Sequence, residues 1–229
     1  MGSWEFRATS SGWVARLDAA ERAALLDVVD DVVELLAADE PGGPWPQVQL
    51  SAEPVAAPSD PALRRLLPDA SRAEPDVAAE FRRLTEDELR ATKAGSLAVL
   101  RAALAADAPE VRVDRVTAPA VAAALTDLRL VLAERLGIRS EADADAACRL
   151  VVEGGPLDVT DPDGMARRFL ATVSTLLGVL QESLVVLMLA DLPDAADVAD
   201  LPDGGDAADP AERDDGHDRG PGSGSGGPR

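Results

Sequence analysis

Histidine and cysteine are nearly absent from this chain. Its 229 residues include one histidine, His217, and one cysteine, Cys148. A single cysteine excludes a disulfide scaffold and a four-cysteine metal site. A single histidine excludes most metal-binding and catalytic-triad chemistry, which depends on imidazole. We therefore assign no catalytic, cofactor-binding or metal-binding residue, and we expect a non-catalytic protein without a cofactor.

Basic residues are few as well. The chain has 22 lysines and arginines against 42 acidic residues, which gives a formal net charge of −20, and Lys93 is its only lysine. An acidic excess of this size repels phosphate backbones and anionic lipid surfaces at long range. It weighs against a nucleic acid or a membrane as the partner. The first eleven residues contain no hydrophobic run typical of a signal peptide, so we expect a cytoplasmic protein.

Composition divides the chain at about residue 192. Residues 193–229 contain nine Asp, one Glu and three Arg among many Gly, Ala and Pro. So few side chains worth burying predict a disordered acidic tail. Residues 1–192 are rich in Leu, Val and Ala, which predicts one helical domain. Within that domain, the prolines of residues 41–60 predict a mobile loop.

Two short segments near the N-terminus alternate apolar and polar residues as strands do. Residues 4–8 and 13–17 show this alternation, and residues 9–12 between them favour a turn. The pattern predicts a β-hairpin with a four-residue loop. Because two strands alone are marginally stable in water, we expect either a third strand near residues 111–113 or a helix that covers one face.

Apolar residues recur at helical spacing through most of the remaining domain. Asp18 and Glu21 have the spacing of a capping box, and Asp60 followed by Pro61 is typical of a helix start. The capping-box spacing recurs at Thr85, where we expect one helix to end and another to begin. The expected helices span about residues 18–36, 60–68, 75–84, 85–104, 119–136, 141–147 and 161–190. These elements predict a mainly α fold, a single helical-bundle domain with a short N-terminal β-hairpin.

The last of these helices contains a long apolar stretch at residues 169–190, whose one ionisable residue is Glu182. The stretch is long enough to span a membrane. However, a glutamate near its middle would be costly in lipid, so we interpret it as the central helix of a soluble bundle, surrounded by its neighbours. A stripe of small or polar residues would let another helix approach closely, either within the fold or in a homodimer. The stripe comprises Ala171, Ser174, Gly178 and Glu182.

One candidate polar cluster joins the two most apolar helices. Arg129 lies at the edge of the apolar face of the helix at 119–136, and a half-buried arginine needs a carboxylate partner. We predict that Arg129 meets Glu182, together with Asp127 and Gln181. As a structural ion pair the cluster would fix the register of the two helices, and this is the interpretation we favour. As a functional site it would be a polar binding or acid–base centre.

Two further patterns have competing interpretations. A hairpin with several short helices is compatible with a winged-helix DNA-binding unit, in which arginine doublets would contact phosphates; the charge of −20 weighs against this. The doublets are Arg64-Arg65, Arg82-Arg83 and Arg167-Arg168. Cys148 has no histidine in the helical domain to act as its base, so we expect it to be a small packed hydrophobe.

Four segments resemble the actinobacterial domain-of-unknown-function family numbered 2017. They are DPALRRLLPD at 60–69, EFRRLTE at 80–86, LTDLRL with RLGI within 125–138, and LQESLV at 180–185. The likeness covers about residues 3–190, and Thr126 and Ala133 stand where the family pattern has Asn and Gly. The resemblance implies no known activity. It implies a link to regulated proteolysis, because genes of the family tend to lie beside that of the Clp protease adaptor for N-degrons.

We therefore expect a soluble, non-catalytic regulatory protein that binds another protein, with a link to Clp-type proteolysis. Two alternatives stay open. One is a winged-helix-like transcriptional regulator, a label that some members of the family carry. The other is an enzyme with a polar site around Asp127, Arg129 and Glu182.

Overall fold

The computed structural model of the protein describes residues 4–38, 56–71, 73–106, 110–153 and 161–192. Most of the proline-rich segment expected at 41–60 and the whole of the tail at 193–229 lie outside these residues. The described elements, in chain order, are β1 (Arg7–Thr9), β2 (Gly12–Arg16), α1 (Ala19–Ala37), α2 (Pro61–Leu66), α3 (Pro75–Ala105), β3 (Glu110–Val113), α4 (Ala118–Leu136), α5 (Glu141–Val152) and α6 (Pro162–Ala190). The mainly α fold with a short N-terminal hairpin is confirmed.

The sheet has three antiparallel strands in the order β1-β2-β3. The expected third strand is therefore confirmed, but the hairpin loop is shorter than predicted, because Thr9 pairs directly with Gly12. Gly12 is required here. Its φ is +135°, and a Cβ at this position would lie 2.4 Å from the carbonyl oxygen of Val113. Only glycine lets β3 pass so close to the turn.

Local signals set the ends of three helices as predicted. Asp18 and Glu21 form a complete capping box at the start of α1. The carboxylate of Asp60 accepts hydrogen bonds from the amides at the start of α2, where Pro61 occupies the first turn. Gly137 ends α4 in the left-handed region, with φ at +72°, and the amide of Ile138 donates to the carbonyl of Ala133 at 2.8 Å.

The break expected at Thr85 is absent, and α3 continues through it for 31 residues. The Thr85 hydroxyl donates to the carbonyl of Phe81, one turn back, at 2.9 Å. A threonine can make this bond inside a helix as readily as it can cap one, so its spacing from Glu88 did not decide between the two. The expected helix at 141–147 also extends further, to Val152.

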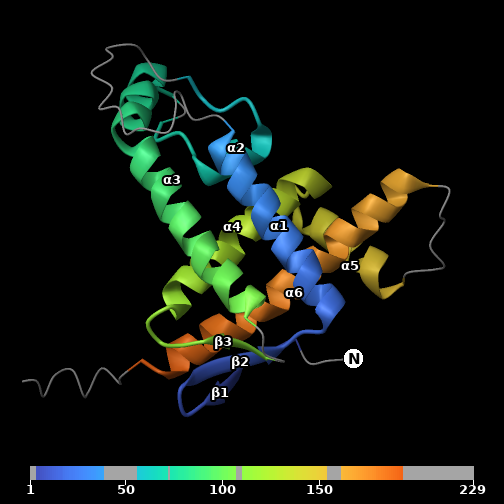
Figure 1. The fold of residues 1–229 in the computed structure, drawn as a ribbon. Helices are drawn as coiled ribbons and strands as arrows, with labels where there is room; N and C mark the ends of the chain where they lie inside the picture. The colour runs from blue at the N-terminus through green and yellow to red at the C-terminus, as the bar shows by residue number, and fades with distance from the viewer. Residues whose placement is uncertain (1–3, 39–55, 72, 107–109, 154–160, 193–229) are drawn as a thin grey trace, which may run out of the picture. The chain divides into compact units, whose positions relative to one another are not determined.

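The core is centred on α4, which contacts α6, α3 and α2 and also touches α1 (Figure 1). Helices α1 and α3 pack against each other as well. The inward side chains of β2 and β3 complete this core with Trp13, Ala15, Val111 and Val113. Nine residues of α4 are buried, namely Ala118, Val121, Ala124, Leu125, Asp127, Leu128, Val131, Leu132 and Leu136.

Helix α6 packs against α4, α5 and the hairpin, but its C-terminal part exposes several apolar side chains, so it is less enclosed than the expected central helix. Its inward face buries Val173, Leu176, Leu177, Leu180 and Leu184. Its outward side chains are exposed mainly near the C-terminal end, and 28% of the most apolar stretch of α6 is fully buried. Among the described helices, α6 is the one long and apolar enough to cross a membrane, by length and composition alone.

Candidate functional site

Asp127, one of the four residues of the predicted cluster, is paired with a residue that the sequence reasoning missed. Its carboxylate lies 2.6 Å from the Nζ of Lys93 on α3. The Asp127 side chain is 7% exposed and that of Lys93 is 18% exposed, so this ion pair is largely closed off from solvent. It joins α3 to α4 in the middle of the bundle.

Arg129 lies on α4 but contacts a different residue of α6 from the one expected. Its Nη1 donates to the Oε1 of Gln181 at 2.5 Å, and the Nε2 of Gln181 donates to the Thr126 hydroxyl at 2.5 Å. Glu182 is exposed, and no described residue forms an ion pair with it. The reason is rotational. Neighbouring residues of a helix differ by about 100° around its axis, so Gln181 borders the face toward α4 while Glu182 points outward.

The four predicted residues therefore do not form one centre. Asp127 belongs to a closed ion pair, Arg129 and Gln181 form an exposed polar contact, and Glu182 faces solvent. A general acid–base site needs titratable groups that converge on a common space. No such arrangement brings Asp127, Arg129 and Glu182 together, and none of them lines the hollow described below.

A second polar network holds the N-terminal half of α3 against α1. Arg90 is buried, at 5% exposed, and donates to the main-chain carbonyl of Leu36 at the end of α1. It also pairs with Glu86 one turn earlier, at 2.7 Å. Arg82 approaches the other oxygen of Glu86 and binds Asp69. The i,i+4 spacing of these three α3 residues was visible in the sequence, but the contact with Leu36 was not.

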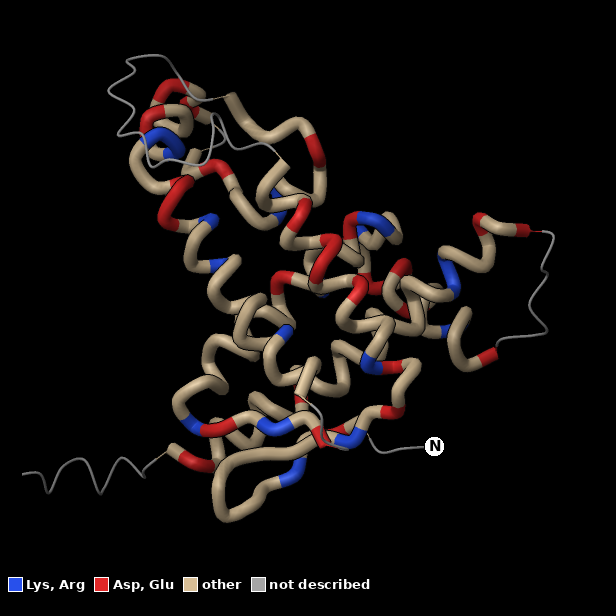
Figure 2. Tube along the Cα trace, viewed as in Figure 1, with Lys and Arg blue, Asp and Glu red and all other residues tan. Residues whose placement is uncertain are grey.

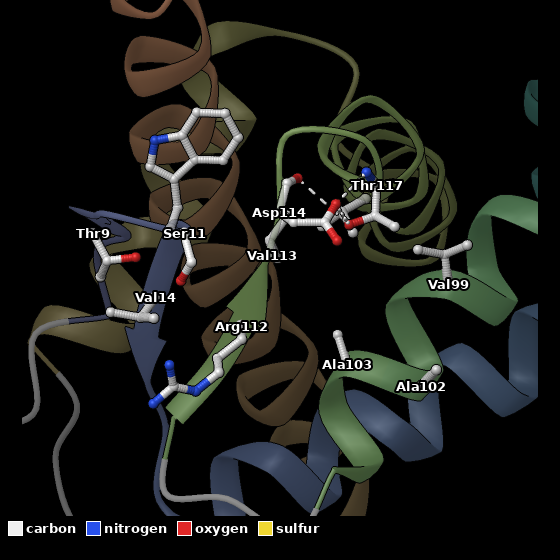
Figure 3. A pocket seen from close by; sticks show the side chains of 12 residues that line it. Thr9, Ser11, Val14, Val99, Ala102, Ala103, Arg112, Val113, Asp114 and Thr117 are labelled. Carbon is white, nitrogen blue, oxygen red and sulfur yellow. Dashed lines mark hydrogen bonds between the residues drawn. The ribbon is translucent and has the colours of Figure 1, made fainter.

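A hollow of about 400 Å³ lies between the sheet and α3, and we call it the edge groove (Figure 3). Arg112, Val113 and Asp114 line it along β3, and residues of the hairpin line it beside them. The opposite wall is α3, which contributes two alanines and a valine, and α4 closes one end. The full lining is Thr9, Ser11, Trp13, Val14, Val99, Ala102, Ala103, Arg112, Val113, Asp114, Thr117 and Val121.

One carboxylate at the rim of the edge groove is already occupied. Asp114 accepts hydrogen bonds from the Thr117 amide at 2.7 Å, the Thr117 hydroxyl at 2.7 Å and the Val116 amide at 3.0 Å. These bonds, led by the one from the Thr117 amide, hold the pKa of Asp114 below its ordinary value. All three bonds go to Oδ1, so this oxygen of Asp114 is engaged in the turn that starts α4.

The C-terminal half of α6 exposes large apolar side chains, and we call these residues the α6 surface. They are Val185, Val186, Leu189 and Leu192, of which Val186 and Leu189 are 59% and 61% exposed. Arg115 fixes the end of this helix by pairing with Asp191 at 2.5 Å, and it also lies over the ring of Trp13. The adjacent Val116 is exposed too. Contiguous apolar residues of this kind mark interaction surfaces.

Exposed apolar residues also occur on α3. Val77, Phe81 and Leu84 form a stripe on the N-terminal half of α3.

On α5 no residue is buried, so Cys148 is exposed and the expectation that it is a packed hydrophobe is wrong. A short helix that packs mainly against α6 does not bury both of its sides.

The arginine doublets at 64–65 and 82–83 pair with groups of the same fold. Arg65 binds Glu134, Arg82 binds Asp69 and Arg83 binds Glu80, while Arg64 donates to the carbonyls of Pro58 and Ser59.

Within the described part of the chain, no group of three or more His, Cys, Asp or Glu side chains could hold a metal ion.

A protein-family model described as Domain of unknown function (DUF2017) matches residues 1–188. This match covers most of the chain and confirms the resemblance noted in its four short segments. No curated protein and no solved structure matches the chain. The interpretation of its role therefore depends on the surfaces and clusters described above.

Proposed function

The chain belongs to the DUF2017 family, whose function is unknown, and we propose that it is a non-catalytic regulatory protein that binds another protein through the α6 surface. The observation that carries this proposal is that the rest of the fold leaves part of α6 exposed. The helix is apolar enough to need burial on several sides, yet only 28% of its most apolar stretch is buried by the fold. Burying the remaining apolar area against a partner would be favourable.

A protein partner fits this surface better than a lipid does. Glu182 lies on the outward face of α6, just one turn before Val185 and Val186. A charged side chain at this depth is costly in hydrocarbon, whereas the rim of a protein interface accepts it. Gln181 on the flank is engaged with α4 through Arg129 and Thr126, so α6 is tied to the bundle along this length.

The process we propose is Clp-type regulated proteolysis, on the strength of the family resemblance. An enzyme at Asp127, Arg129 and Glu182 finds no support, because these residues do not converge. A winged-helix regulator has little support, because the arginine doublets at 64–65 and 82–83 pair with groups of the same fold.

Affinity purification of the tagged full chain from its host tests the proposal. We expect a stoichiometric partner with the wild type, and its loss with the double variant Val186→Ser/Leu189→Ser. The matched control is Val77→Ser/Leu84→Ser, which removes the same kinds of side chain from the exposed stripe on α3 and should keep the partner. A partner that persists with the α6 variant, or no partner at low and moderate salt, would reject the proposal.

Flotation with liposomes tests the lipid alternative directly. We expect the wild type to stay at the bottom of a sucrose gradient with vesicles of either neutral or anionic lipid. Flotation that the α6 double variant abolishes would show that the surface binds a membrane instead of a protein.

A further inference from the structure

The two outer edges of the sheet differ in their surroundings. At the β1 side, the chain is tied to α6, because the Phe6 amide donates to the Ser183 hydroxyl at 2.9 Å. At the β3 side, the strand edge lines the edge groove, and the other wall is the C-terminal half of α3 (Figure 3). Unpaired strand edges are ready templates for another extended chain.

The register shows which main-chain groups of β3 are free. Since only two residues separate Thr9 from Gly12, these two form a hydrogen-bonded pair. Hydrogen-bonded and non-hydrogen-bonded pairs alternate along an antiparallel ladder. Trp13 therefore exchanges hydrogen bonds with Val113, and Ala15 with Val111.

The N–H and C=O of Arg112 must then point away from β2, toward the outer edge. Among the described residues, neither group has a hydrogen-bond partner. The same alternation turns the main-chain groups of Glu110 outward. Unsatisfied groups of this kind, beside a hollow, are what an added strand would pair with.

The edge groove is lined largely by small apolar side chains, which suit the side chains of an extended peptide. Val113 and Val121 are buried at its base, and Ala102 and Ala103 on α3 carry the smallest side chains that a helix normally presents. A strand presents alternate side chains to opposite faces. Every second side chain of an added strand could enter the groove, and small or β-branched apolar residues would fit its 400 Å³.

The three strands carry more basic than acidic residues, unlike the chain as a whole. Arg7, Val14 and Arg112 lie in one row across the exposed face of the three strands. The strands carry three arginines, Arg7, Arg16 and Arg112, and one acidic residue, Glu110, which pairs with two of them. Figure 2 shows basic positions on the sheet with acidic ones among them, while acidic positions are frequent on the helices. A ligand with carboxylates would find its complement here.

We propose that an extended acidic segment of a partner protein adds to the free edge of β3 as a fourth, antiparallel or parallel strand. Its main chain pairs with Arg112, its alternate small apolar side chains enter the edge groove, and a carboxylate on the exposed face approaches the guanidinium of Arg112. This interaction goes beyond the role proposed for the α6 surface. It uses different residues, so either can hold if the other fails.

Phage display of random heptapeptides against the full chain tests this directly. We expect the enriched peptides to alternate small apolar residues with Asp or Glu. The variant Arg112→Pro removes the outward N–H, which an edge strand tolerates, and the variant Arg112→Ala removes only the side chain. For an enriched peptide, Arg112→Pro should weaken binding about tenfold beyond Arg112→Ala, the loss expected for one hydrogen bond of about 1.4 kcal/mol.

A second variant, on α3, tests the groove without any change to β3. Ala103→Leu fills the groove from α3, and Ala98→Leu places the same side chain on an exposed α3 position that does not line it. Ala103→Leu should abolish peptide binding and Ala98→Leu should not, with folding of both verified by thermal melting. Hydrogen exchange should show protection of the Arg112 amide on binding. No enrichment, basic or helical consensus peptides, or equal binding by Arg112→Pro and wild type would overturn the proposal.

Discussion

The Nζ of Lys93 lies 2.6 Å from the Oδ1 of Asp127, which makes the only lysine in the chain a link between α3 and α4. Both side chains are mostly shielded from solvent, so each charge depends on the other for its solvation. An ion pair in this position contributes less to stability than its distance suggests, because desolvation offsets much of the attraction. Its main effect is that α3 and α4 must pack so that Lys93 and Asp127 stay paired.

Removing one partner of this pair should therefore be costly. We expect Lys93→Met or Asp127→Ala to lower the free energy of unfolding by about 3 kcal/mol, because either leaves a shielded charge without its counterion. The double variant Lys93→Met/Asp127→Leu should recover most of this loss. Urea unfolding followed by tryptophan fluorescence measures the change. Arg101→Ala, which breaks the exposed pair with Asp30, is the control and should have a much smaller effect on the free energy of unfolding; equal costs would contradict the role assigned to burial.

Arg90 should be equally sensitive, for a different reason. Its guanidinium satisfies the Leu36 carbonyl at the end of α1 and pairs with Glu86. Arg90→Met should lower the free energy of unfolding by about 3 kcal/mol, because both Glu86 and the carbonyl lose a buried partner. Arg83→Met removes an exposed arginine of the same helix that pairs with Glu80 and should have little effect. A mild effect of Arg90→Met would show that water replaces the guanidinium.

Asp114 gives a pH dependence with a definite sign. Its pKa is lowered, first by the Thr117 amide and then by the Thr117 hydroxyl. A carboxyl with a lowered pKa stabilises the fold above its ordinary pKa, and this contribution disappears as the pH falls through the lowered value. The stability difference between wild type and Asp114→Asn should thus shrink from about pH 6 to about pH 3. Urea midpoints measure it, and Asp145→Asn on the exposed side of α5 is the control. A difference that grows toward low pH would contradict the assigned hydrogen bonds.

Gly178 tests the hypothesis of self-association through the small-residue stripe of α6. A Cβ at Gly178 would meet nothing within 4 Å, so Gly178→Ala should stabilise the single chain by about 0.5–1 kcal/mol through helix propensity. Gly95→Ala on α3, which is equally open, should do the same. The self-association hypothesis predicts a mass of about twice 23.8 kDa in light scattering, and a return to the monomer with Gly178→Leu. A wild type with the mass of one chain would contradict it.

Binding to a polyanion separates the proposed role from that of a DNA-binding regulator. With a net charge of −20 and the doublets at 64–65 and 82–83 engaged within the fold, the protein should pass through a heparin column at low salt. Retention that falls steeply with salt would instead indicate phosphate contacts. A second passage over immobilised random-sequence duplex DNA provides the comparison.

Features confined to a few neighbouring residues were predictable from the sequence. The capping box at Asp18 and Glu21, the proline start after Asp60 and the stop at Gly137 act within one helical turn, so residue types at fixed spacing sufficed to identify them. The third strand at Glu110–Val113 was anticipated because an isolated hairpin needs a partner. The false break at Thr85 shows the limit of such signals, since one hydroxyl can cap a helix or bond back within it.

The sequence alone determined the approximate positions of most helices and strands, the mainly α class and the acidic charge, because these follow from local geometry and composition. Only the tertiary structure decided that Arg129 meets Gln181, that Lys93 meets Asp127 and that one side of α6 is left open. Which side chains meet depends on the rotation and offset of packed helices, and a difference of one residue turns a side chain by about 100°. The hollow between β3 and α3 likewise depends on how the sheet packs against the helices.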